Sequence, residues 1–81
     1  MINLVFMANE EKIFEGNVSK VQTSTPNGPV TILPEHQPYM SRIDGFVSYT
    51  PENGAPNIQN ISRGFLYTNG KLCFIVADSI I

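Results

Sequence analysis

Disulfide pairs and clustered charge are absent from this chain of 81 residues, and each absence limits what the protein can be. The single cysteine, Cys73, has no partner for an internal disulfide, and its apolar neighbours predict a buried thiol in a reducing compartment. The five lysine and arginine residues stand singly, and the formal net charge is only −2. We therefore expect neither a nucleic-acid nor an acidic-membrane surface on this protein.

Long apolar runs are missing as well. None approaches the ~20 consecutive apolar residues that a transmembrane helix requires. The apolar start, residues 1–6, lacks basic flanking residues and a small-residue cleavage site, so it is not expected to be a signal peptide. We expect no direct membrane insertion, and any association with a membrane would pass through a partner protein.

Catalytic chemistry is poorly supplied. His36 is the only histidine, and its nearby acids, Glu35 and Asp44, form no recognised triad with a nucleophile. One histidine and one buried cysteine are too few for a metal site, and the isolated glycines form no phosphate-binding loop. We therefore expect no catalytic residue, no metal and no cofactor. A lone histidine of this kind is more typical of a structural or interface position.

Turn-forming residues recur about every ten positions, and short runs rich in valine, isoleucine, phenylalanine, tyrosine and threonine lie between them. The expected turns are 8–11, 15–17, 26–28, 44–45, 52–54 and 69–70. The expected strands are 2–7, 12–14, 18–23, 30–33, 46–50, 57–62, 65–68 and 72–77. Residues 39–43 offer one helical turn at most. This pattern predicts one all-β domain over residues 1–81, an antiparallel sandwich or barrel.

The last expected strand, Leu72–Ala77, is apolar on both of its faces. An antiparallel strand with one solvated face normally alternates apolar with polar residues. Either a loop or another strand covers the second face, or that face is a surface for a partner. Both explanations stay open from the sequence.

The stretch Gly28–Pro38 is the most distinctive segment, because prolines flank the only histidine. Proline fixes its own φ angle and pushes the preceding residue toward extended geometry. Pro34 and Pro38 therefore predict a stiff connection that presents His36. Such loops usually bind a partner or brace the fold.

Three separated segments, in this order, resemble the N-terminal β-sandwich domain of the epsilon subunit of F-type ATP synthases, called delta in mitochondria. The first, residues 14–21, is similar to the family's F-x-G-x-V-x-x-V pattern. The second, Gly28–Pro38, is similar to G-x-x-G-I-L-P-G-H-x-P. The third joins residues 62–66 to 76–79 and is similar to S-G-G-F-L followed by L-A-D. The resemblance covers nearly the whole chain.

This resemblance implies a flattened sandwich of about ten short strands in a non-catalytic rotor subunit of the central stalk. Such a subunit joins the gamma subunit to the membrane ring of proteolipid subunits and couples proton translocation to ATP synthesis. It implies a place at the cytoplasmic face of the bacterial inner membrane, peripheral through the complex. The residues that it assigns to the gamma and ring interfaces are Gly28, Pro29, Val30, Pro34, Glu35, His36, Pro38, Arg42 and Gly64.

The chain also departs from the family pattern. Thr31, Glu35 and Arg63 stand where the family has glycine, and we expect the backbone at Thr31 to differ because a β-branched residue disfavours positive φ. The family's C-terminal helical hairpin is not expected here, so its inhibitory and ATP-binding roles do not carry over.

Two other classes of function remain open. The chain is alternatively a free-standing binding module for a carbohydrate or peptide, using the loop Pro26–Pro38 and Tyr39, or a small hydrolase built on His36. Purely structural or solvent-exposed roles are also expected for several residues. Gly64 fits a bulge, Phe65 a core aromatic and Arg42 a solvated charge, and Met40 and Ile43 are expected to pack under the proline-rich loop.

Overall fold

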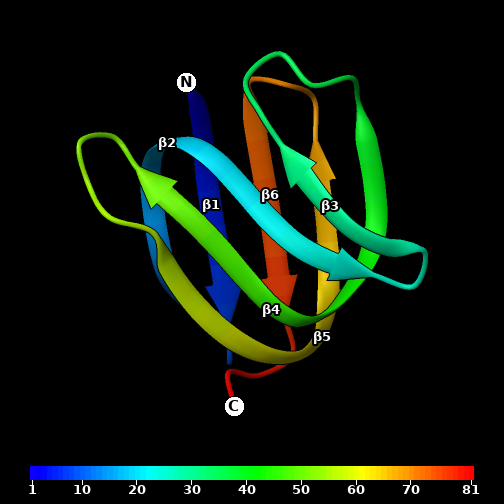
Figure 1. Cartoon of the computed structure of the whole chain (residues 1–81). Helices are drawn as coiled ribbons and strands as arrows, with labels where there is room; N and C mark the ends of the chain where they lie inside the picture. The colour runs from blue at the N-terminus through cyan, green and yellow to red at the C-terminus, as the bar shows by residue number, and fades with distance from the viewer.

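Alternating apolar residues fold into strands throughout the chain (Figure 1). The structure is a computed structural model that describes all of residues 1–81, and the all-β prediction is confirmed. It contains no helix with the length and apolar character needed to cross a bilayer. The strands are β1 (Ile2–Ala8), β2 (Glu11–Thr25), β3 (Gly28–Ile32), β4 (Tyr39–Pro51), β5 (Asn57–Thr68) and β6 (Leu72–Ala77).

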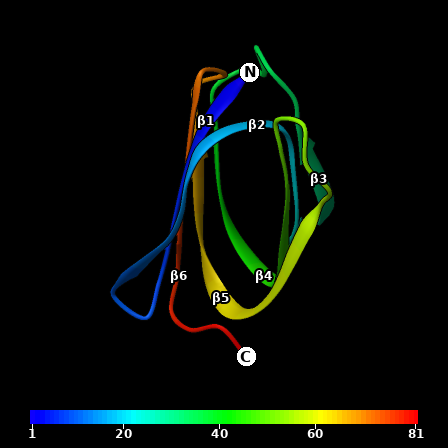
Figure 2. The ribbon, with the colours of Figure 1, turned by 90° about the vertical axis from the view of Figure 1, so that its left-hand side faces the viewer.

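One sheet of six strands makes both layers of the sandwich. Its order is β1-β6-β5-β4-β2-β3, and an additional pairing between β1 and β2 closes it. Seen from the side, β1 and β6 lie in one layer and β3 lies in the other (Figure 2). The predicted flattened sandwich is confirmed, with one departure from antiparallel pairing, because β1 runs parallel to β6.

Long strands that bend between the layers replace several of the short strands expected from the sequence. Residues 12–14 and 18–23 belong to the single strand β2, and 57–62 and 65–68 belong to β5. The turns predicted at 15–17 and 44–45 therefore lie inside strands. The pairing of β4 with β5 shifts register between Asp44 and Gly45, where Gly45 has a φ of +81°. A bulge of this kind bends a strand without ending it, which explains the difference.

Residues 39–43 also form strand rather than a helical turn, because they begin β4. Within this segment the side chain of Ile43 is buried in the core, whereas Met40 is 70% exposed. The expectation that both pack under the proline-rich loop is therefore wrong.

The core lies between the two layers and contains fifteen buried apolar residues. On β1 the alternation is complete, since Ile2, Leu4, Phe6 and Ala8 all point inward. Cys73 on β6 is fully buried, as predicted, and removal from water raises the pKa of its thiol to about 12. The cysteine therefore serves as a small core residue.

Candidate partner-binding surface

Apolar side chains gather on the solvent side of the layer that contains β1 and β6. The exposed members on β4, β5 and β6 range from 38% exposed at Leu72 to 70% at Met40, and those on β1 are half-buried. We call this surface the outer face. Its residues are Val5, Met7, Met40, Phe65, Tyr67, Leu72, Phe74 and Val76.

Strand register places seven of these side chains, all but Leu72, in two adjacent rows together with Arg42. Opposite positions on neighbouring strands lie side by side, so a row that crosses four strands spans roughly 14 Å. The first row is Val5, Phe74, Tyr67 and Met40. The second row is Met7, Val76, Phe65 and Arg42. The outer face is thus a continuous apolar surface with Arg42 at one corner. Beyond β1 the rows continue to Glu15 and Lys12 of β2, whose charges pair with each other.

The outer face answers the question that the sequence left open about β6. Phe74 and Val76 are 41% and 43% exposed, so neither a loop nor another strand covers this side of β6. Contiguous exposed apolar side chains on a small protein are typical of an interaction site. The structure therefore favours the second explanation, a surface for a partner.

Phe65 belongs to this surface, so its predicted place in the core is wrong. Ile61 is buried, but an extra residue at Ser62 shifts the pairing of β5 with β4 by one position. Because side chains alternate between faces along a strand, this shift turns Leu66 inward and Phe65 outward. Phe65 is consequently 57% exposed.

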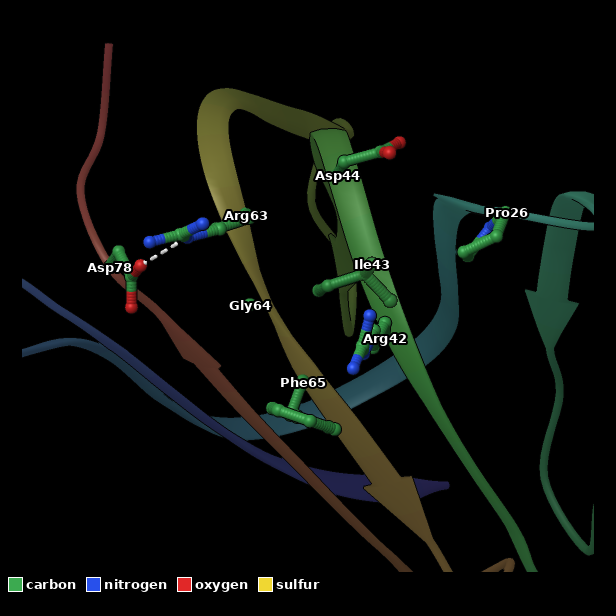
Figure 3. Close-up of a pocket in the computed structure, with 8 residues that line it drawn as sticks. All are labelled: Pro26, Arg42, Ile43, Asp44, Arg63, Gly64, Phe65 and Asp78. Carbon is green, nitrogen blue, oxygen red and sulfur yellow. Dashed lines mark hydrogen bonds and ion pairs between the residues drawn. The ribbon is translucent and has the colours of Figure 1, made fainter.

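A shallow hollow of about 440 Å³ lies beside Phe65 (Figure 3). Its charged residues differ in their contacts. Nε of Arg63 donates a hydrogen bond of 2.8 Å to Oδ2 of Asp78, and this contact raises the pKa of Arg63. Arg42 forms no ion pair, and Figure 3 shows Asp44 pointing away from it. The lining residues are Pro26, Arg42, Ile43, Asp44, Arg63, Gly64, Phe65 and Asp78.

The hollow brings together two of the predicted interface residues, Arg42 and Gly64. Gly64 has a structural reason for its identity. A Cβ atom added there would lie 2.2 Å from the carbonyl oxygen of Val76 and 2.8 Å from Cα of Ala77. The absence of a side chain at Gly64 therefore allows β5 to pair closely with β6.

The remaining predicted interface residues form two groups at opposite ends of β3 (Figure 1). Gly28 closes the turn between β2 and β3 with a φ of +114°, and Pro29 and Val30 follow it along β3. Thr31 also lies in β3 and has no positive φ, in line with its β-branched side chain. The other group, residues 34–38, comes after β3, so the nine predicted residues do not form one site.

The loop of residues 33–38 is braced by the turn between β5 and β6. The amide of Glu35 donates to the carbonyl oxygen of Gly70 at 2.9 Å, and a Cβ atom at Gly70 would lie 2.5 Å from the carbonyl oxygen of His36. His36 is half-buried, with Nδ1 2.6 Å from the carbonyl oxygen of Gln37 and its ring edge-on to Tyr39. These contacts fix the histidine in place.

The surroundings of His36 do not favour the hydrolase alternative. Its side-chain hydrogen bond goes to backbone, and no hydroxyl, thiol or carboxylate group is bonded to it. No three histidine, cysteine, aspartate or glutamate side chains gather in a way that would hold a metal ion. His36 is therefore better explained as a structural element of the loop.

Glu35 adopts a φ of +66°, a backbone conformation that favours glycine. The family pattern has glycine at this position. We expect Glu35→Gly to raise the free energy of unfolding by about 1 kcal/mol, because it relieves this backbone strain. Glu35→Ala is the matched control, since it removes the carboxylate but keeps the strained Cβ. Urea denaturation of the three proteins measures the effect, and equal stability of Glu35→Gly and Glu35→Ala would contradict it.

None of the apolar residues of the outer face is among the site residues predicted from the sequence, and of its two rows only Arg42 was predicted. The sequence showed the second apolar side of β6, but Val5 and Met40 join that side only through the pairing of β1 with β6 and of β4 with β5. The signal in the sequence was the strand β6 with two apolar sides. Which strands lie beside β6 is known only from the fold.

Comparison with known proteins agrees with the fold and identifies the family. The chain is 29% identical over 79 residues to the ATP synthase epsilon chain of Corynebacterium glutamicum, covering 95% of this chain and 64% of that relative. It is 29% identical over 75 residues to the epsilon chain of Rhodococcus erythropolis, covering 90% and 62% respectively. The chain therefore spans less than two thirds of the length of either relative.

Solved structures show the same fold at lower identity. A chain of the Euglena gracilis mitochondrial ATP synthase (OSCP/F1/c-ring) superposes with a TM-score of 0.90 at 20% identity, covering 99% of this chain and 52% of that chain. A chain of the Tetrahymena thermophila mitochondrial ATP synthase (central stalk/c-ring) gives 0.79 at 10% identity, covering 99% and 65%. The model of the β-sandwich domain of the ATP synthase delta/epsilon chain matches residues 1–81. The protein therefore belongs to the ATP synthase delta/epsilon family through its β-sandwich domain.

Proposed function

We propose that this protein is a non-catalytic subunit of the central stalk of an F-type ATP synthase. In this role it joins the gamma subunit to the membrane proteolipid ring, so that proton-driven rotation is coupled to ATP synthesis. Family membership supports a place in the ATP synthase complex. The uncovered outer face is the observation that supports the role of joining other subunits. A rotor subunit must be held firmly by its neighbours, and a continuous apolar surface supplies such a contact.

We assign the outer face to the gamma subunit. The loop of residues 33–38 is bonded to the turn at Gly70, which joins the two strands at the centre of the outer face. This bond supports a role for His36 near the same contact. The turn at Gly28, at the far end of β3, is then left for the proteolipid ring, at the cytoplasmic face of a bacterial inner membrane.

Co-expression with the gamma subunit of the same organism, followed by size-exclusion chromatography, tests this function. We expect the two proteins to co-elute as a one-to-one complex at micromolar concentration. Phe65→Glu should weaken the complex at least tenfold, because it puts a carboxylate inside the buried apolar contact, opposite Arg42.

Ile58→Glu is the matched control. Ile58 lies on the same strand and is 66% exposed, but it precedes the bulge and pairs with Ser48 in the other half of the sandwich. This variant should bind as well as the wild-type protein. Separate elution of the unmodified chain and gamma would refute the proposed function.

A further inference from the structure

Arg42 is the single charged side chain in the two rows of the outer face. It lies opposite Phe65 on β5, and Val76 and Met7 continue the same row. The hydrogen bonds and ion pairs of the structure leave its guanidinium group without a partner. A charged group next to an apolar contact surface therefore faces solvent in the free protein.

The other arginine of the hollow is in a different position. Arg63 already donates to Asp78 at 2.8 Å, so its charge is matched within the chain. Figure 3 shows the side chain of Arg42 directed toward Phe65 and that of Arg63 directed away toward Asp78. Only Arg42 combines an unmatched charge with a place on the outer face.

Covering Phe65 also removes water from Arg42. Burial of an unpaired charge is strongly unfavourable, whereas a carboxylate with good geometry forms two parallel hydrogen bonds with a guanidinium group. The outer face, about 14 Å across, is wide enough for one segment of a partner chain. Because Arg42 lies at one corner, an acidic residue of that segment can reach it in only one orientation and position of the segment. The partner therefore needs an acidic residue at one point of an otherwise apolar contact.

We propose that the segment of the gamma subunit that covers the outer face carries an aspartate or glutamate that pairs with Arg42 and sets the register of that segment. This proposal rests on the function proposed above. Phe65 and its apolar neighbours supply contact area, and Arg42 supplies the specificity of the contact.

Affinity measured by titration calorimetry with the purified gamma subunit tests the proposal. Arg42→Met keeps most of the apolar stem and removes the charge, and it should weaken binding at least about thirtyfold, because the partner carboxylate is left unpaired. Arg42→Glu should weaken it further. Arg63→Met is the matched control in the same hollow and should stay within about threefold of the wild-type value.

Ionic strength and charge reversal give independent readouts. Raising the salt concentration should reduce the difference in affinity for gamma between the wild-type protein and Arg42→Met, since salt screens the ion pair between Arg42 and the partner carboxylate. Replacing the partner carboxylate of gamma by arginine should restore binding to Arg42→Glu. If Arg42→Met binds like wild type while Phe65→Glu does not bind, the Arg42 contact is refuted and the function stands. If the wild-type chain binds no gamma, both are refuted.

Discussion

Gly64→Ala is expected to lower the free energy of unfolding by about 3 kcal/mol or more, a large part of the stability of a small domain. The new Cβ atom would lie 2.2 Å from the carbonyl oxygen of Val76 and 2.8 Å from Cα of Ala77. Both atoms belong to the backbone of β6, which is paired with β5 on one side and β1 on the other. The strand therefore cannot move aside without breaking its own hydrogen bonds.

Urea denaturation followed by circular dichroism measures this effect. Gly54→Ala is the matched control, because its Cβ atom would meet nothing closer than Cβ of Pro51 at 3.4 Å and its φ is not positive. That variant should unfold within about 0.5 kcal/mol of the wild type. A similarly small change at Gly64 would show that β5 and β6 separate more easily than their pairing indicates.

Native Cys73 is expected to react with thiol reagents roughly a thousandfold more slowly than an exposed cysteine. Reagents attack the thiolate, and burial raises the pKa of this thiol from 9.0 to about 12, so the thiolate fraction at pH 8 falls by about that factor. Burial also blocks access. Labelling with iodoacetamide in buffer and in 8 M urea compares the two states, and rapid labelling of the folded protein would contradict the expectation.

The same pKa shift predicts a dependence of stability on pH. The folded protein holds the Cys73 proton more tightly than the unfolded chain does. The contribution of the protonated Cys73 thiol to the free energy of unfolding is therefore complete below pH 9 and is lost as the pH rises toward 12. Cys73→Ala should lack this component, so its stability should fall less steeply over that range than that of the wild type.

Local sequence signals predicted those parts of the fold that depend on neighbouring residues. Asn69-Gly70 indicated the hairpin of β5 and β6, and the apolar neighbours of Cys73 indicated a buried thiol; both predictions are confirmed. The bulge at Ser62 was not predictable in this way. Phe65 and Leu66 are adjacent apolar residues, and only the register with β4 decides which of them faces the core.

The candidate surface shows the same limit. The two apolar sides of Leu72–Ala77 are visible in the sequence, and one of them is the centre of the outer face. Its extent depends on strands that are far apart in the chain, because Val5 and Met40 reach it only through the pairing of β1 with β6 and of β4 with β5. Arg42 and Arg63 can be told apart only once the ion-pair partner of Arg63 is known. That partner, Asp78, lies fifteen residues after Arg63 in the chain.

The place of β6 between β1 and β5 has a consequence for synthesis on the ribosome. The second edge of β1 stays unpaired until β6, residues 72–77, has been made. Until those residues emerge, β1 and β5 both present open edges on which other nascent chains can add strands. Such distant pairing also makes closure slow, in the range of milliseconds to seconds for sandwiches and barrels. β6, which is made later than β1 to β5, thus protects the open edge of β1.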